Sequence, residues 1–387
     1  MAGLGDSGPY RRGAWLRPAL PALRRLRALA RPGPRLARFD PVPALELPSH
    51  PTSSAAIRAI DFHTHLGRWL TPDSSWMAPD VDALLALMDA SNLAALVNLD
   101  GRWGDELDEN LRRYDHAHPN RFYTFCHLDW QLLDSPAGTG ALVQSLEQSA
   151  RQGARGLKVW KDLGLSVTAG GRRVLPDDPA LAPVWEAAGS LGLPVLMHTA
   201  DPVAFFQPVG VRNERVEELT AHPSISQARE GAAGLDRLLD AFEHMVANHP
   251  ATTFVGAHVG NHVENLAAVS TLLDRYPNLL VDISGRVAEI GRQPRAAARF
   301  VAAHPDRVLF GTDQLPIRAD DYGVYFRLLE TDDEYFSYAP GRTPPPHGRW
   351  QISGLALDGG ILEQVYAANA RRLLRIAPET PIASEPS

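Results

Sequence analysis

The sequence contains very little cysteine and very little lysine. Cys126 is the single cysteine in 387 residues, which excludes an intramolecular disulfide and any metal site built from several thiolates. Lys158 and Lys161 are the two lysines, so 36 of the 38 basic residues are arginines. With abundant Ala, Gly, Pro and Leu, this bias is typical of drift toward GC-rich codons. The two lysines lie close together in Gly-Leu-Lys-Val-Trp-Lys, and both chance and a retained chemical role can explain that.

Long apolar runs are also lacking. No stretch approaches the roughly 18 continuous apolar residues of a membrane-spanning helix, so we expect no membrane segment and a cytoplasmic protein. A net charge of −7 and eight tryptophans argue against a nucleic-acid partner. We expect instead a small-molecule substrate, with a carboxylate as one option, and we leave assembly into a homo-oligomer open.

The N-terminal region differs in composition from the rest of the chain. Residues 1–38 hold nine arginines against one acid, Asp6, and prolines interrupt any helix there. A secretory signal needs roughly 7–15 continuous apolar residues, and none is present. We therefore expect a disordered Arg-rich leader over residues 1–54, with an organellar transit peptide as the alternative. A second disordered tail is expected over residues 377–387.

Past residue 56, short apolar or β-branched runs alternate with longer amphipathic stretches, which is typical of repeated βα units. Strands are predicted over residues 57–65, 95–100, 122–128, 156–160, 194–198, 253–258, 279–284 and 307–313. Helices are predicted over residues 80–92, 106–116, 141–152, 180–191, 235–248, 263–275, 295–303, 322–330 and 360–374. This pattern predicts an α/β fold, a (β/α)8 TIM barrel over residues 55–376. The alternative is a doubly wound sheet, but no G-x-G-x-x-G motif opens a helix after the first strand.

Two connecting segments are much longer than the usual 2–6 residues. Residues 201–234 follow the fifth predicted strand, and residues 314–353 follow the eighth. Both come at the carboxyl ends of strands, where TIM barrels build their active sites. Both also carry aromatic residues, namely Phe205, Phe206, Tyr335, Phe336, Tyr338 and Trp350. We expect these loops to cover a substrate; packing on the barrel or an oligomer contact is the alternative.

Histidines and an aspartate end several of the predicted strands. His63 and His65 lie two residues apart at the end of the first strand, so both can face the barrel mouth. His198, His258 and Asp313 end the fifth, sixth and eighth strands. Five ionisable groups in such a place are costly unless they are paired or bind a metal. Imidazole and carboxylate suit one divalent ion, with Zn²⁺ first and Mn²⁺, Fe²⁺ or Co²⁺ as alternatives.

These motifs resemble the amidohydrolase superfamily, in particular the amidohydrolase-related branch that includes aminocarboxymuconate-semialdehyde decarboxylase. The resemblance covers residues 56–374. It rests on Asp-Phe-His63-Thr-His65, His198, Ala-His258-Val-Gly-Asn, Phe-Gly-Thr-Asp313 and the closing Tyr366-Ala-Ala-Asn-Ala-Arg-Arg-Leu-Leu. It implies that His63, His65, His198 and Asp313 bind the metal. It also implies that Asp313 shares proton transfer, and that His258 is the catalytic acid/base or polarises an oxyanion.

Two basic residues are candidates for substrate binding. Lys158 lies in the fourth strand, where dinuclear members of the superfamily carry a lysine carbamate between two metals. We rank substrate contact or support of the metal ligands first, a surface role next and the carbamate last. Arg286 follows the seventh strand, where its guanidinium suits bidentate capture of a carboxylate.

The resemblance leaves the reaction open. Because the set that activates water is complete, we predict a metal-dependent hydrolase acting on an amide, ester or lactone. The alternative is a non-oxidative decarboxylase of an aromatic or unsaturated acid, which the branch resemblance, the aromatic loops and Arg286 favour. A barrel kept only for binding would lack one or more of the metal-ligating residues. Here each of those positions holds a histidine or an aspartate.

Overall fold

The structure is a computed structural model that describes residues 36, 39–229 and 231–377. The chain divides into two compact units, Met1–Leu45 and Glu46–Ser387. The helices and strands discussed below all belong to the second unit. Most of the predicted leader, and the predicted tail beyond residue 377, lie outside the described residues.

The second unit begins earlier than the predicted boundary at residue 55. His50 donates its backbone N–H to Asp333 Oδ2 at 2.7 Å, and Arg327 Nη2 donates to Ser49 Oγ at 3.0 Å. Asp333 is 2% exposed, so the contact with His50 satisfies a buried carboxylate. Residues 46–54 therefore belong to the barrel unit and not to the leader.

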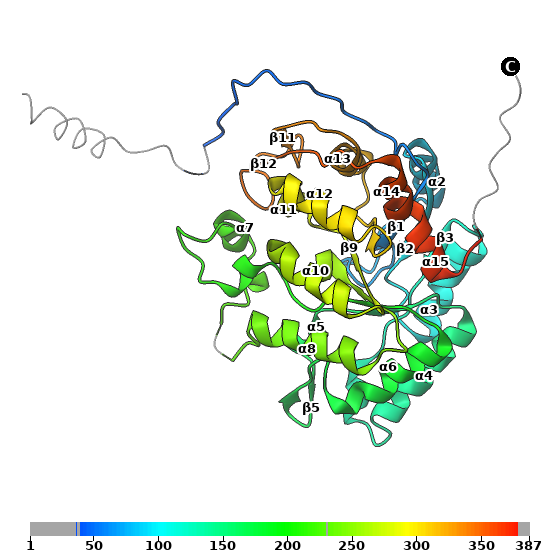
Figure 1. Cartoon of the computed structure of the whole chain (residues 1–387). Coiled ribbons are helices and arrows are strands. Elements are labelled where there is room, and N and C mark those ends of the chain that lie inside the picture. Colours follow the sequence, from blue (N-terminus) through cyan, green and yellow to red (C-terminus); the bar gives the residue numbers. More distant parts are fainter. Residues whose placement is uncertain (1–35, 37–38, 230, 378–387) are drawn as a thin grey trace, which may run out of the picture. The chain divides into compact units, whose positions relative to one another are not determined.

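Parallel strands form the centre of this unit. They are β1 (Ala59–Thr64), β2 (Leu93–Asn98), β3 (Phe122–Thr124), β4 (Leu157–Val159), β7 (Val195–Met197), β8 (Phe254–Gly256), β9 (Leu279–Asp282) and β10 (Val308–Leu309). Figure 1 shows β1, β2, β3 and β9 among them. Backbone hydrogen bonds join β1-β2-β3 in one sheet and β10-β9-β8-β7-β4 in another. All neighbours within the two sheets run parallel.

Two junctions connect these sheets. Between β3 and β4, Cys126 N donates to Gly156 O at 2.9 Å, and Lys158 N donates to Cys126 O at 2.8 Å. Between β10 and β1, Phe62 N donates to Phe310 O at 2.9 Å. The strands thus follow one another in chain order around a ring, as a TIM barrel requires. The predicted fold is confirmed, and the doubly wound alternative is excluded.

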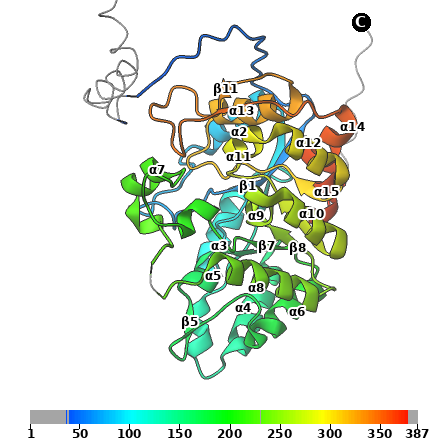
Figure 2. The same ribbon diagram turned by 60° about the vertical axis from the view of Figure 1, so that its left-hand side comes forward.

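Helices follow the strands and cover the outside of the barrel. They are α2 (Val81–Ala90), α3 (Gly104–Leu111), α4 (Thr139–Gln152), α6 (Ala182–Leu191), α8 (Leu235–Asn248), α10 (Leu266–Arg275), α12 (Pro294–Ala303), α13 (Ala319–Glu330), α14 (Gly359–Glu363) and α15 (Asn369–Leu374). A π-helical turn joins the last two, so the predicted closing helix is continuous. Figures 1 and 2 both show α8, α10 and α12 in a row outside the strands. Asp80 starts α2 as predicted, because its side chain accepts from Ala83 N at 2.9 Å.

The pleat of the strands separates two apolar clusters. The larger cluster combines helix side chains with strand residues such as Leu157 and Val159, so these face outward. The smaller one joins alternate strand residues to α15, and it includes Leu196 and Val255. Lys158 pairs in register with Leu196, and successive residues of a strand face opposite sides. Lys158 therefore faces the inside of the barrel, which the sequence alone left undecided.

The two long segments both lie at the carboxyl ends of their strands. Residues 201–234 contain α7 (Val216–Ala221), and residues 314–353 contain α13 and the hairpin β11 (Phe336–Ser337) to β12 (Gln351–Ile352). Arg349 joins them through Glu217, with Nε–Oε2 and Nη2–Oε1 distances of 2.8 and 2.9 Å. They form one connected cap. Within the described part of the chain, no helix is both long and apolar enough to cross a membrane.

One salt bridge fixes the first segment to the barrel. Arg215 pairs with Glu289, in the short helix α11 (Val287–Arg292) after β9. Both side chains are 2% exposed. Arg215 Nη1 also donates to Glu218 at 2.7 Å. Burial alone would raise the pKa of Glu289, but Arg215 holds it below its usual value.

Candidate metal centre

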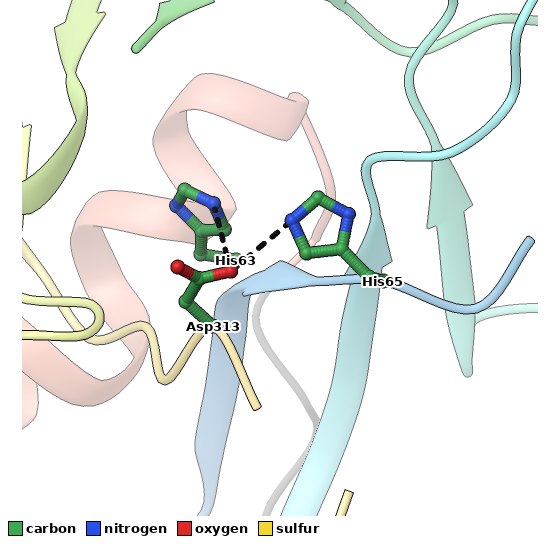
Figure 3. A group of neighbouring side chains, drawn as sticks. All are labelled: His63, His65 and Asp313. Atoms are coloured by element: carbon green, nitrogen blue, oxygen red, sulfur yellow. Dashed lines mark ion pairs between the residues drawn. The ribbon is translucent and has the colours of Figure 1, made fainter. Parts of the chain in front are cut away.

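Three of the predicted ligands meet at the mouth of the barrel. Asp313 Oδ1 lies 3.2 Å from His65 Nε2 and 3.7 Å from His63 Nε2. One ligand atom from each residue lies within 4.8 Å of the other two. Figure 3 shows the Asp313 carboxylate facing both imidazole rings. The His-x-His pair and the aspartate of the last strand thus form one cluster, although 248 residues of sequence separate His65 from Asp313.

A buried carboxylate fixes the far side of each imidazole ring. His63 Nδ1 lies 2.8 Å from Asp282 Oδ2, and His65 Nδ1 lies 2.7 Å from Asp100 Oδ1. A carboxylate accepts only, so both Nδ1 atoms carry hydrogen and both Nε2 atoms are left facing Asp313. Such carboxylate–histidine pairs orient metal ligands and make them more basic.

The arrangement requires a positive charge at its centre. His65 Nε2 is buried and has no hydrogen-bond partner in the described part of the chain. In its neutral form it would present a lone pair to a carboxylate oxygen 3.2 Å away, which is repulsive. A proton or a metal ion removes the repulsion, and three converging acceptors of imidazole and carboxylate type suit a divalent metal. The residues present therefore fit the ion that the sequence implied.

His258 lies beside this cluster. Its Nε2 lies 3.9 Å from Asp313 Oδ2, and its Nδ1 lies 2.8 Å from the Ser284 carbonyl oxygen. The carbonyl can only accept, so Nδ1 carries the hydrogen and the Nε2 lone pair faces the site. Burial, followed by the charge of His198, lowers the pKa of His258 well below its usual value. His258 is thus a neutral imidazole with an acceptor nitrogen toward Asp313.

His198 occupies a more peripheral position than the sequence suggested. Its Nδ1 lies 3.4 Å from His258 Nε2, and its Nε2 lies 3.7 Å from Asp201 Oδ1. The compact group of ligand atoms consists of His63, His65 and Asp313 and leaves His198 outside. Its role as a fourth ligand stays a prediction.

His258 and Asp313 adopt unusual backbone conformations. Both have φ of 57°, in the left-handed region that non-glycine residues rarely occupy. Asp282 Oδ1 accepts the backbone N–H of His258 at 2.9 Å, and His63 O accepts that of Asp313 at 2.8 Å. Strained positions of this kind concentrate at functional sites.

Lys158 lies against the cluster from inside the barrel. Its Nζ is 3.3 Å from His63 Nε2, and the residue is 1% exposed. Burial lowers the pKa of Lys158 to about 8, although Asp313 opposes the shift. Lys161 points elsewhere, because its Nζ pairs with Asp201 Oδ1 at 2.7 Å. Of the two lysines, only Lys158 contacts the predicted metal ligands in the described structure.

Arg286 lies in the wall of a cavity that adjoins Asp313. The cavity has a volume of about 550 Å³, and Thr312, Tyr325 and Tyr338 also line it. Arg286 Nη1 donates to Gly285 O at 2.8 Å. Of the loop aromatics expected to cover a substrate, Tyr338 lines this cavity.

The remaining loop aromatics mostly have packing roles. Phe205 and Phe336 are 5% and 6% exposed. Trp350 lies under the Arg292 guanidinium at 3.8 Å, and Tyr335 is 50% exposed. Among these residues, packing on the barrel and cap accounts for most of what the sequence suggested was a ligand wall.

Sequence reasoning missed several residues that support the site. Asp282 and Asp100 bind His63 and His65, and the ring centroid of Trp160 lies 5.6 Å from those of His65 and His198. Asp282 could have been found, because it is an isolated acid in the apolar run Leu-Leu-Val-Asp-Ile. A lone carboxylate in a buried strand needs a partner.

Replacing Asp282 by Asn should weaken metal binding about 10–100-fold, because the support of His63 Nδ1 is lost. The test is the bound metal at a series of buffered free-ion concentrations. Asp115→Asn is a matched control, because Asp115 bonds the backbone and hydroxyl of Thr124 and no predicted ligand. Equal metal affinity in both variants would contradict the assigned role of Asp282.

Comparison with known proteins agrees with the geometry. Residues 60–376 match the family model described as Amidohydrolase. No curated protein matches the chain. Among solved structures, 2,6-dihydroxybenzoate decarboxylase from Rhizobium is 16% identical, with a TM-score of 0.53 over 83% of this chain and 99% of that one.

Two further solved structures share the fold. Dihydroxybenzoic acid decarboxylase from Polaromonas sp. JS666, solved with bound manganese, is 14% identical, with a TM-score of 0.52 over 82% of this chain and 97% of that one. An amidohydrolase from Burkholderia multivorans is 17% identical, with a TM-score of 0.50 over 83% and 100% of the two chains. The family match covers most of the chain, and the site contains a histidine and aspartate group of metal-ligand type. The chain therefore belongs to the amidohydrolase family, as a TIM-barrel enzyme with a candidate site for a divalent metal.

Proposed function

We propose that this protein is a metal-dependent hydrolase that cleaves an ester, lactone or amide bond in a small carboxylate-bearing molecule. The observation that carries the proposal is the convergence of His63 Nε2, His65 Nε2 and Asp313 Oδ1, with both Nδ1 atoms fixed by carboxylates. When bound there, a divalent ion, with zinc or manganese as the first candidates, would lower the pKa of water toward neutrality and polarise a carbonyl. His198 is proposed as a further ligand.

Asp313 and His258 are the proposed proton carriers. Asp313 Oδ2 lies 3.9 Å from His258 Nε2, which carries a lone pair. Burial would raise the pKa of Asp313, but His63 holds it well below its usual value, so Asp313 is ionised and can accept a proton from a nucleophile. His258 faces the same space, and its fixed Nδ1–H keeps Nε2 aimed at the reacting atoms.

Lys158 and Arg286 are the proposed substrate contacts. Lys158 presents its amine on the inner face of the barrel, beside His63. Arg286 lines the cavity that opens at Asp313. A planar guanidinium suits a carboxylate through two parallel hydrogen bonds. The substrate would thus place its cleaved carbonyl near Asp313 and an acidic group near Arg286.

Decarboxylation is the second candidate, and the position of Arg286 favours it. A cation beside a cavity of this size also suits an aromatic acid, and the solved decarboxylase that shares the fold was crystallised with 2,6-dihydroxybenzoate. In that case Asp313 or His258 would first take up a proton from the substrate or from water and then pass it to the carbon that loses CO₂. The chemistry of this chain's residues serves both reactions.

The two reactions are separated by their products. We expect purified protein to hydrolyse members of a panel of lactones, esters and amides, with loss of activity on chelation and recovery with Zn²⁺ or Mn²⁺. The same panel should include hydroxybenzoates, with CO₂ measured directly. Release of CO₂ without any hydrolysis would reject the first proposal in favour of the second, and hydrolysis that survives complete metal removal would reject both.

A further inference from the structure

A residue in the wall of the cavity beside Asp313 has hydrogen-bond donors without a partner among the described residues. This residue is Gln314, which is 6% exposed. Its Oε1 accepts the backbone N–H of Arg318 at 2.7 Å. That bond fixes the orientation of the amide, because only the oxygen can accept. The Nε2 group is buried and has no partner among residues 36, 39–229 and 231–377.

An unpartnered amide N–H₂ in a buried position is costly. Leaving such a donor unsatisfied costs about 1–3 kcal/mol, so most buried polar groups have a partner. Gln314 directly follows Asp313, and both residues line the cavity. The structure thus holds a buried donor pair in a residue of the cavity wall, and a ligand acceptor would satisfy it.

The charges of the cavity specify the kind of acceptor. Three arginines line the cavity, Arg286, Arg318 and Arg342, against two acids, Asp313 and Asp321. Arg342 Nη2 binds Asp321 at 2.7 and 2.8 Å, whereas neither Arg286 nor Arg318 forms an ion pair within 4.0 Å among the described residues. The excess is positive, so an anion fits the cavity better than a neutral group.

The burial of Arg286 also favours binding of an anion in this cavity. Arg286 is 9% exposed, and its one hydrogen bond to protein in the described part of the chain is to its neighbour Gly285. Glu289 attracts it at longer range but pairs directly with Arg215. A buried guanidinium without a direct carboxylate partner is costly, and a bound carboxylate would offset that cost.

We propose that Gln314 and Arg286 together bind a free carboxylate of the substrate, one that lies apart from the cleaved bond, and that the substrates are therefore monoesters, monoamides or lactones whose hydrolysis yields dicarboxylic acids. Gln314 is the specificity-determining residue. Its amide donates to the carboxylate oxygens of the substrate. Arg286 neutralises the charge of that carboxylate, and Arg318 attracts it to the cavity. This inference rests on the proposed function for the position of the cleaved group, but the carboxylate site can be tested without turnover.

The test is direct binding of flexible straight-chain dicarboxylates, malonate to adipate, and of the corresponding neutral diamides. Titration calorimetry is run on metal-loaded and on chelated protein. We expect at least one dicarboxylate to bind at least ten times more tightly than its diamide in both forms, because a charged acceptor strengthens each hydrogen bond. Equal binding of acids and amides, or no binding at millimolar concentrations, would overturn the proposal.

Gln314→Glu is the decisive variant. It keeps the size of the side chain and the oxygen that accepts from Arg318, but it replaces the donor pair by a second acceptor. Dicarboxylate binding should fall about 10–100-fold while diamide binding changes little. Gln314→Leu should lower the affinity for dicarboxylates about tenfold, and it replaces Gln314→Glu in the test if that variant does not fold. Gln144→Leu, on the exposed face of α4, is the matched control and should bind as the unmodified protein does.

The outcomes also separate this inference from the proposed function. If dicarboxylates bind through Gln314 but no bond is hydrolysed, the carboxylate site stands and the reaction is wrong. If hydrolysis is found but Gln314→Glu leaves the affinity for every dicarboxylate unchanged, the reaction stands and the site is wrong.

Discussion

Replacing Asp313 by Asn should lower kcat/KM by about a thousandfold, the usual scale for loss of a proton carrier at an active site. The change keeps the size of the side chain but removes the charge that faces His63 and His65. An amide can accept through one oxygen only, so both the metal contact and the proton acceptor are affected. No other described carboxylate lies in the group formed with these two histidines.

Measuring activity at several metal concentrations separates the two effects. If saturating metal raises kcat/KM of the variant less than about tenfold, the loss of proton transfer is the larger effect. Full recovery of kcat/KM would show that Asp313 acts only as a metal ligand. Bound metal is determined on the same samples. Asp274→Asn, an exposed acid on α10, is the control and should keep full activity.

Replacing Arg215 by Met should lower the free energy of unfolding by about 3–5 kcal/mol, the range measured when one partner of a buried ion pair is removed. Glu289 would then be left 2% exposed, with Arg292 at 4.0 Å as its remaining ion-pair partner in the described structure. The partner Glu218 would lose its bond to Nη1 as well. This is the largest stability effect that we expect from a single side chain outside the metal centre.

A double-mutant cycle tests the cause. Glu289→Gln should lower the free energy of unfolding much less in the Arg215→Met background than in the unmodified protein, since it removes a buried charge that has lost its shorter ion pair. Unfolding by urea is followed by fluorescence and circular dichroism. Arg275→Met breaks an exposed pair with Glu243 and should leave the free energy of unfolding nearly unchanged, because solvent screens that pair. If Arg215→Met lowered the free energy of unfolding no more than Arg275→Met does, the argument from burial would be refuted.

The barrel was predictable because its signals are local. Each strand is a short apolar run, and each helix has an apolar stripe with polar ends, as in α2 with its cap at Asp80. The short hairpin β5 (Thr168–Ala169) to β6 (Arg172–Arg173) was not predicted. Its strands have two residues each, which is too short for any periodicity. The early start of the barrel unit was also missed, because His50 is tied to Asp333 by contacts far apart in sequence.

The site was predictable in part. The spacing of His63 and His65 and the strand-end position of Asp313 follow from the sequence, because parallel strands bring their carboxyl ends to one face. The partners at Nδ1 do not, since nothing local links Asp282 to His63. The position of His198 depends on side-chain direction at the strand end, which strand order does not specify. The inward direction of Lys158 likewise needed the observed register.

The cap has a consequence for how activities are exchanged between relatives. Its two segments share Arg349–Glu217, and the first is anchored by Arg215–Glu289. A chimaera that imports one segment alone would leave charged residues without their ion-pair partners in the other segment or in α11. To transfer a substrate specificity into this barrel, residues 201–234, residues 314–353 and α11 should therefore be exchanged together. Natural recombination within either segment should be selected against.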